Sequence, residues 1–189
     1  MVKLNKIYTR TGDSGETGLA DGSRIAKDDP LAQAIGDVDE ANSAIGLALL
    51  AITDEDVAGM LGRIQNESFD LGADLATPGE DFSPSEMTLR VIQPQIDRLE
   101  REIDGMNEGL EPLRSFILPS GRSGSAQLHL ARAIVRRAER AAVSAARKRR
   151  LNPLALIYLN RLSDHLFVAA RILAKSGGGD ILWQPGATR

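Results

Sequence analysis

The stretch DPLAQAIGDVDEANSAIGLALLAI, residues 29–52, decides the fold class of this chain. Asp29 has the side chain of a helix N-cap, and Pro30 has the fixed φ that suits the first helical position. The stretch is therefore predicted to be an amphipathic α-helix that buries one face against other elements. Its apolar residues recur at the three- and four-residue spacing of one helix face, and they are Ile35, Val38, Ala41, Ile45, Leu49 and Ile52.

Similar apolar stripes follow in residues 57–75, 91–106, 125–148 and 153–176. Short loops that contain proline or glycine separate these segments, and the sequence has no internal repeat. The pattern predicts an all-α, up-down five-helix bundle in one domain that spans residues 1–189. In this prediction, residues 29–176 form the bundle, residues 1–28 form an irregular N-terminal segment, and residues 177–189 form a C-terminal tail.

The composition of the chain limits the classes of protein to which it can belong. The chain has 189 residues, of which 42% are hydrophobic and 4% are aromatic, so a core of Leu, Ile, Val and Ala is expected. It has no cysteine, which excludes disulfides and a thiol nucleophile. Without a spanning apolar run or a signal peptide at its start, it is expected to be cytoplasmic and without membrane partners. The formal net charge of -3 predicts no general attraction to nucleic acid.

Two polar segments have the composition of a local polyanion site. TRTGDSGETG, residues 9–18, combines three glycines with three threonines, so backbone N–H groups and hydroxyls can surround an anion or contact Mg²⁺. RAIVRRAER, residues 132–140, places arginines on one arc of a helix, where guanidinium groups can bind phosphate. Arg132 and Arg136 form a like-charge i,i+4 pair, which is unfavourable unless an anion or an acidic partner lies opposite. Together these segments indicate a triphosphate site.

Ordinary structural roles remain open for the same residues. A charged helix face is commonly just solvated, and the later run at residues 147–150 suits a helix C-terminus electrostatically. Asn160 is a candidate for binding a base or ribose, or it is an ordinary polar surface residue. His129 and His165 have no metal-ligand spacing, so we predict no protein metal site and expect surface or core roles for them.

Five separated blocks, which cover most of the chain in order, resemble PduO-type ATP:cob(I)alamin adenosyltransferases. The blocks are KIYTRTGDSGETGL (6–19), KDD (27–29), GDVDEANSAIG (36–46), RAIVRRAER (132–140) and YLNRLSDHLF (158–167). The P-loop pattern GxxxxGK[ST] occurs nowhere, which separates the chain from P-loop corrinoid adenosyltransferases.

The resemblance implies a homotrimer whose active sites lie between neighbouring subunits, with ATP, Mg²⁺ and a cobalamin or related corrinoid as ligands. It assigns residues 1–28 as an ATP-binding segment. It also implies that Asp39 pairs with Arg132 across the subunit interface. The implied nucleotide contacts are Thr9, Arg10, Thr11, Gly12, Thr17, Gly18, Lys27, Arg136, Arg137, Glu139, Arg140 and Asn160. The family often has lysine where Arg10 stands, so a backbone contact is better supported at that position than a side-chain contact.

The implied chemistry is attack by a Co(I) corrinoid on the 5′-carbon of ATP, which forms adenosylcobalamin and releases triphosphate. The protein needs no nucleophile of its own; Lys27, Arg136 and Mg²⁺ stabilise the leaving group, and Glu139 holds an arginine or contacts the ribose. Phe116 matches the apolar residue that lies under the corrin ring in the family, whereas the ordinary alternative is a core phenylalanine. A reductase and an acceptor of the product are implied partners. A non-catalytic ATP-binding trimer and a polyanion-binding bundle are the alternatives.

Overall fold

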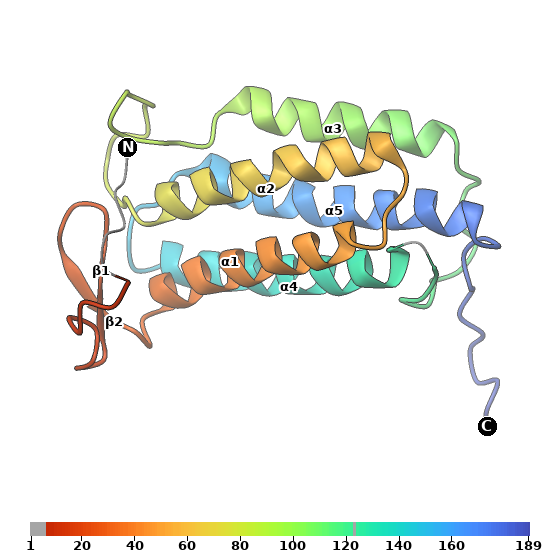
Figure 1. Ribbon diagram of the computed structural model, residues 1–189, viewed down its shortest axis with the longest axis horizontal. Helices are drawn as coiled ribbons and strands as arrows, with labels where there is room; N and C mark the ends of the chain where they lie inside the picture. Colours follow the sequence, from red (N-terminus) through yellow and green to blue (C-terminus); the bar gives the residue numbers. More distant parts are fainter. Residues whose placement is uncertain (1–6, 123) are drawn as a thin grey trace.

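The computed structural model describes residues 7–122 and 124–189. Successive helices run in opposite directions, and α1 packs most extensively against α4, which in turn packs against α5 (Figure 1). α3 packs on the other side of α5, and α2 packs against α1. The predicted all-α five-helix bundle is confirmed. Its helices are α1 (Pro30–Leu49), α2 (Glu55–Leu75), α3 (Gln93–Glu108), α4 (Ser125–Ala146) and α5 (Pro153–Ser176).

The helix boundaries follow from local chemistry. Helix α1 begins at Pro30 as predicted, because the carboxylate of Asp29 accepts a hydrogen bond from Leu31 N and caps the first turn. Asn152 caps α5 in the same way. Before α4, Gly124 has φ 90° and lies so close to the segment that follows α1 that a Cβ there would be 2.5 Å from Ile52 Cγ1. Only glycine fits this position without displacing its neighbour.

The N-terminal segment contains regular structure that the sequence analysis missed. β1 (Glu16–Gly18) and β2 (Arg24–Ala26) form a two-stranded antiparallel hairpin within the segment that was predicted to be irregular. Each strand has only three residues, too few for a recognisable alternation of polar and apolar side chains. The backbone N–H of Ala20 donates to Ala76 O and joins the hairpin to the end of α2. Residues 1–6 of the predicted ATP-binding segment lie outside the described residues.

The hairpin and the C-terminal tail lie at opposite ends of the bundle (Figure 1). At the hairpin end, Arg149 donates to both carboxylate oxygens of Asp29, at 2.8 and 2.9 Å. Arg150 pairs with Glu80, so both arginines have the structural role expected of the run at the end of α4. Among the described residues, no helix is sufficiently long and apolar to cross a membrane.

Candidate active site

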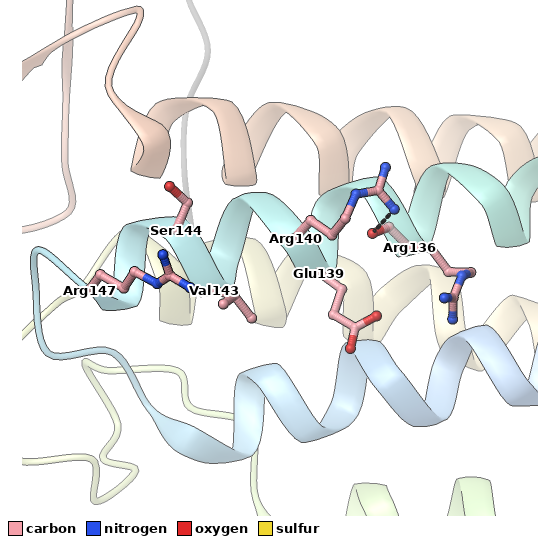
Figure 2. Close-up of a pocket in the computed structure, with 6 residues that line it drawn as sticks. All are labelled: Arg136, Glu139, Arg140, Val143, Ser144 and Arg147. Atoms are coloured by element: carbon pink, nitrogen blue, oxygen red, sulfur yellow. Dashed lines mark hydrogen bonds between the residues drawn. The ribbon is translucent and has the colours of Figure 1, made fainter.

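The predicted arginine face of α4 forms an open groove with a volume of about 440 Å³. Arg136 and Glu139 point toward α5, whereas Arg140 leans the other way and donates to Arg136 O at 2.9 Å (Figure 2). Val143, Ser144 and Arg147 complete the lining. Within the described parts of the chain, neither Arg136 nor Arg140 has a carboxylate within ion-pair distance. With Arg136, Arg140 and Arg147 against the single carboxylate of Glu139, the groove presents an excess of positive charge to an anion.

Asn160 of α5 joins this groove through Glu139. Its amide nitrogen donates to Glu139 Oε1 at 3.1 Å, and its amide oxygen accepts from Arg161 Nη1 at 3.0 Å. Arg161 also donates to Glu100 of α3 at 2.6 Å. Partners on both sides thus fix the orientation of the Asn160 amide. The structure brings Arg136, Glu139, Arg140 and Asn160 together at this groove.

Arg137 lies apart from the groove. Its Nε donates to Asp37 Oδ1 of α1 at 3.0 Å, and its guanidinium also pairs with Glu40. Asp37 is buried, and Gln33 donates to the same carboxylate oxygen. These contacts join α4 to α1, so the structure does not place Arg137 beside the other candidate nucleotide residues.

The N-terminal candidates form a compact loop before and within the hairpin. Arg10 has φ 63°, a left-handed conformation that few non-glycine residues adopt. The hydroxyls of Thr9 and Thr11 lie 2.9 Å apart. Lys27 N donates to Gly15 O at 2.8 Å. The ammonium of Lys27 lies over the loop, since a Cβ built on Gly12 would be 3.2 Å from its Nζ.

Two more of the predicted nucleotide contacts, Thr17 and Gly18, lie on β1, the first strand of the hairpin. Arg24, which the sequence analysis did not select, fastens the loop to the hairpin. Its Nη2 donates to Thr11 O at 2.7 Å, and its Nε donates to Glu16 at 3.2 Å. Its position in a cross-strand pair could be found only after the hairpin was known.

A second cavity, of about 750 Å³, opens at the other end of the α4 face. Its lining is largely aromatic and apolar, with Phe116, Phe167 and Trp183 as the ring side chains. Phe116 is 78% exposed, so the alternative that it simply fills the core is wrong. The sequence analysis missed Trp183 and Phe167, although Trp183 is the only tryptophan of the chain. A lone tryptophan in a polar tail is a signal that could have identified it.

Arg132 lies at the boundary between the cavity and the arginine face. It lines the cavity, and its guanidinium lies 5.9 Å from the centre of the Phe167 ring. Its Nε is buried, and no described residue makes a hydrogen bond with it. Burial, together with the charge of Arg136, lowers the pKa of Arg132 from its ordinary value. A half-buried guanidinium with an unpaired Nε is stabilised when a carboxylate or another anion binds to it.

Asp39 lies on a different face of the bundle. It is exposed on α1 and lines a groove with residues of α2, including Phe69, which is 70% exposed. Arg132 faces Phe167 of α5 instead. The structure of one chain therefore does not bring Asp39 and Arg132 together.

Comparisons with known proteins agree with this fold. The family model described as cobalamin adenosyltransferase matches residues 7–173. A corrinoid adenosyltransferase of Mycobacterium tuberculosis is 50% identical over 191 residues, which cover 100% of this chain and 97% of that protein. The corrinoid adenosyltransferase of Bacillus subtilis is 41% identical over 96% of this chain and 94% of its own length.

A solved structure of a related protein shows that the similarity extends to the three-dimensional fold. It is a phenylalanine-to-alanine variant of a PduO-type ATP:corrinoid adenosyltransferase from Lactobacillus reuteri, complexed with cobalamin and ATP. It has a TM-score of 0.85 and 38% identity, and the match covers 95% of this chain and 99% of that one. The helical bundle, together with the names of the matched family and relatives, identifies the chain as a transferase. The chain belongs to the cobalamin adenosyltransferase family and is an enzyme of the corrinoid adenosyltransferase class.

Proposed function

We propose that this enzyme binds the triphosphate of ATP in the α4 groove and the corrinoid in the aromatic cavity. The observation that supports this arrangement is the spacing of Arg132 and Arg136, which lie one helical turn apart on α4. Arg132 lines the cavity and Arg136 lines the groove. A turn rises about 5.4 Å, so ligands in the two cavities can meet with their reacting atoms in contact.

The reaction is a single nucleophilic displacement. The electron pair of Co(I) forms the new bond to the 5′-carbon of ATP, while the bond from that carbon to the triphosphate oxygen breaks. The electron pair of the broken bond leaves with triphosphate, and cobalt becomes formally Co(III). Arg136 and Arg140 stabilise the charge on the leaving group, and Glu139 with Asn160 orients the nucleoside. The protein contributes orientation and electrostatics, so the lack of cysteine is consistent with the mechanism.

We also propose that Mg²⁺ enters with the nucleotide. Among the described residues, no group of three or more His, Cys, Asp or Glu side chains could hold a metal ion. Mg²⁺ commonly keeps several waters and takes substrate phosphates as ligands, so it does not need such a group. The adjacent hydroxyls of Thr9 and Thr11 are suitable hard oxygen donors. When bound, the ion would reduce the negative charge of the triphosphate beside Lys27.

The proposed assembly is a homotrimer in which each active site lies between two copies. Asp39 and Arg132 lie on different faces of one chain, so an ion pair between them requires a second copy. The enzyme also needs an electron donor to produce Co(I), and an acceptor for the adenosylated product. We expect a reductase and a corrinoid-dependent enzyme in these roles.

An anaerobic assay with chemically reduced Co(I) corrinoid tests the activity. We expect the Co(I) absorbance to be replaced by that of the alkylated corrinoid, with one triphosphate released for each corrinoid converted. Omission of ATP is the control for spontaneous oxidation. Binding of ATP without conversion of Co(I) would instead identify a non-catalytic ATP-binding bundle.

A further inference from the structure

The chain reverses direction as soon as α5 ends, before the C-terminal tail leads away from the bundle (Figure 1). The backbone N–H groups of Gly177 and Gly179 both donate to Ala174 O at 2.9 Å. Gly178 has φ 111° and Gly179 has φ 91°, conformations that strain any residue with a side chain. The reversal brings Asp180 back beside Arg171 of α5.

The returning tail pairs with the segment that carries Phe116. Leu118 N donates to Ile181 O, and Trp183 N donates to Phe116 O, each at 2.8 Å. Ser115 Oγ donates to Trp183 O at 3.0 Å. The ring centres of Phe116 and Trp183 are 6.0 Å apart. We call this short antiparallel pairing the aromatic ladder, since it presents both rings to the second cavity.

The aromatic ladder has little of its own to stabilise it. Its hydrogen bonds are few, and the side chains of Phe116 and Trp183 remain 78% and 45% exposed. Isolated two-stranded pairings are marginal in water, because fixing each backbone residue costs about 1–2 kcal/mol of conformational entropy. A persistent ladder therefore needs an attachment to the bundle.

Arg171 supplies that attachment for both strands of the ladder. Its Nε donates to Asp180 Oδ2 at 2.9 Å, immediately before the tail strand. Its Nη2 donates to Glu111 O at 2.8 Å, in the segment that leads to Phe116. Arg171 is only 6% exposed, so these charge-assisted bonds are shielded from solvent. The guanidinium of Arg171 thus holds the two segments that carry the rings of Phe116 and Trp183.

We propose that Arg171 and Asp180 form a clamp that positions Phe116 and Trp183 for corrinoid binding. The proposal rests on the proposed function, in which the second cavity binds the corrinoid. Arg171 and Asp180 do not line the cavity, so both are positioning residues that act through the aromatic ladder. The clamp lies far along the bundle from the hairpin, and it should leave ATP binding unaffected (Figure 1).

The variant Asp180→Asn tests the clamp with little change in shape. Trp183 is the only tryptophan, so fluorescence of the full-length protein reports on the ladder directly. In the variant, we expect the emission maximum of Trp183 to shift to the red. We also expect its indole ring to become more accessible to the quencher iodide. We expect the Kd for cob(II)alamin, measured by quenching of Trp183, to rise about tenfold, which is the loss of one charged hydrogen bond. The Kd for MgATP, measured by calorimetry, should stay at the wild-type value.

Lys175→Gln is the matched control. Lys175 lies one turn further along α5 and donates to Gly109 O at 2.9 Å, so it also attaches this loop to the helix, whereas Arg171 makes the hydrogen bond to Asp180 of the tail. It should behave as wild type in both measurements. If Lys175→Gln and Asp180→Asn changed the Trp183 fluorescence and the Kd for cob(II)alamin equally, the clamp would be overturned. Any attachment of the loop to α5 would then be sufficient to position the rings.

Arg171→Lys gives a second test, since one ammonium cannot reproduce both guanidinium contacts. It should weaken cob(II)alamin binding like Asp180→Asn, with the helical circular dichroism retained. An unchanged Trp183 spectrum and an unchanged corrinoid Kd in both variants would overturn the clamp. If the wild-type protein shows no quenching by cob(II)alamin, the assignment of the cavity itself fails, which is a distinct result.

Discussion

The amide of Asn160 donates to Glu139 Oε1 over 3.1 Å and thereby joins α5 to the arginine face of α4. Arg161 donates to the other end of the same amide, so Asn160 cannot rotate without losing a charged hydrogen bond. The carboxylate of Glu139 consequently stays on the α5 side of the groove, near Arg136 (Figure 2). The two residues should act as one unit when a nucleotide binds.

A double-mutant cycle on Glu139→Gln and Asn160→Ala measures that coupling. Each single variant should raise the KM for ATP, whereas the double variant should be little worse than the more impaired single variant. The expected coupling is about 0.5–3 kcal/mol, as for other residues in direct contact. The KM for the corrinoid serves as the internal control. Additive effects on the KM for ATP would show that the two side chains act independently.

Arg136→Ala should lower kcat by about 10²–10³-fold, the usual cost of losing one group that stabilises transition-state charge. Arg136 is exposed and lies opposite the buried face of α4, so the melting temperature should change little. Steady-state kinetics with saturating ATP and pre-reduced corrinoid measure the effect. Arg101→Ala, on the exposed surface of α3, is the matched control. Near-normal turnover of the Arg136 variant would remove this residue from catalysis.

The contrast between Arg136 and Arg137 indicates where sequence analysis stops. Periodicity predicted the bundle well, because each apolar stripe is a property of one helix alone. Adjacent residues on a helix point about 100° apart, so which of two arginines faces solvent depends on the neighbouring helix. Arg137 meets Asp37 of α1, and no pattern within α4 contains that information.

The same limit applies to the aromatic cavity. Phe116 was identified from a family resemblance, but the exposure of its side chain and its contact with Trp183 could not be predicted from the sequence. Trp183 reaches it only because Gly178 and Gly179 reverse the chain, and a glycine run does not specify the direction of the reversal. The three-residue strands of the hairpin were likewise too short to produce a pattern.

Asp29→Asn should lower stability in a pH-dependent manner. The guanidinium of Arg149, and then the N–H of Leu31, lower the pKa of Asp29 from its ordinary value of 3.8. A carboxylate whose pKa is lowered on folding contributes stability above its unfolded pKa, and the contribution is lost as pH falls through the folded pKa. Asparagine can still cap α1, so the expected loss at pH 7 is only about 1 kcal/mol.

Urea unfolding at pH 7 and at pH 3, at one protein concentration, measures this difference. The gap between Asp29→Asn and wild type should be largest at pH 7 and should narrow as pH falls below about 3.8. Asp28→Asn, at the neighbouring exposed position, is the control and should show no such gap. A gap of the same size at both pH values would mean that the ion pair with Arg149 does not stabilise the fold.

Asp39→Ala should weaken assembly more than it weakens the helix. Asp39 is exposed in the single chain, whereas Arg132 is half-buried and has no ion pair with a carboxylate of residues 7–122 or 124–189. If a neighbouring copy supplies the partner, loss of Asp39 should cost about 2–5 kcal/mol of association free energy. Light scattering over a concentration series measures the oligomer. The reversed pair, Asp39→Arg with Arg132→Asp, should restore assembly, and failure to do so together with additive single effects would refute the pairing.

Phe116→Ala should separate a role in corrinoid chemistry from a role in stability. Because the side chain is 78% exposed, its removal leaves no core cavity, and the free energy of unfolding should change by less than about 1 kcal/mol. The variant should bind MgATP normally, since Phe116 lies in the other cavity. It should also retain some activity with corrinoid that has been reduced to Co(I) beforehand.

The defect should appear when Co(II) must be reduced on the enzyme. An apolar ring beneath cobalt excludes water and the nucleotide base from the lower axial position, which removes electron donation to the orbital that accepts the incoming electron. That orbital then has a lower energy, and a biological donor can reduce the metal. Electron paramagnetic resonance of the variant with MgATP and Co(II) corrinoid should therefore show loss of the four-coordinate signal. Phe82→Ala should keep that signal, since Phe82 lines neither cavity and its ring lies against Arg90. An undiminished four-coordinate signal in Phe116→Ala would exclude the ring from this step.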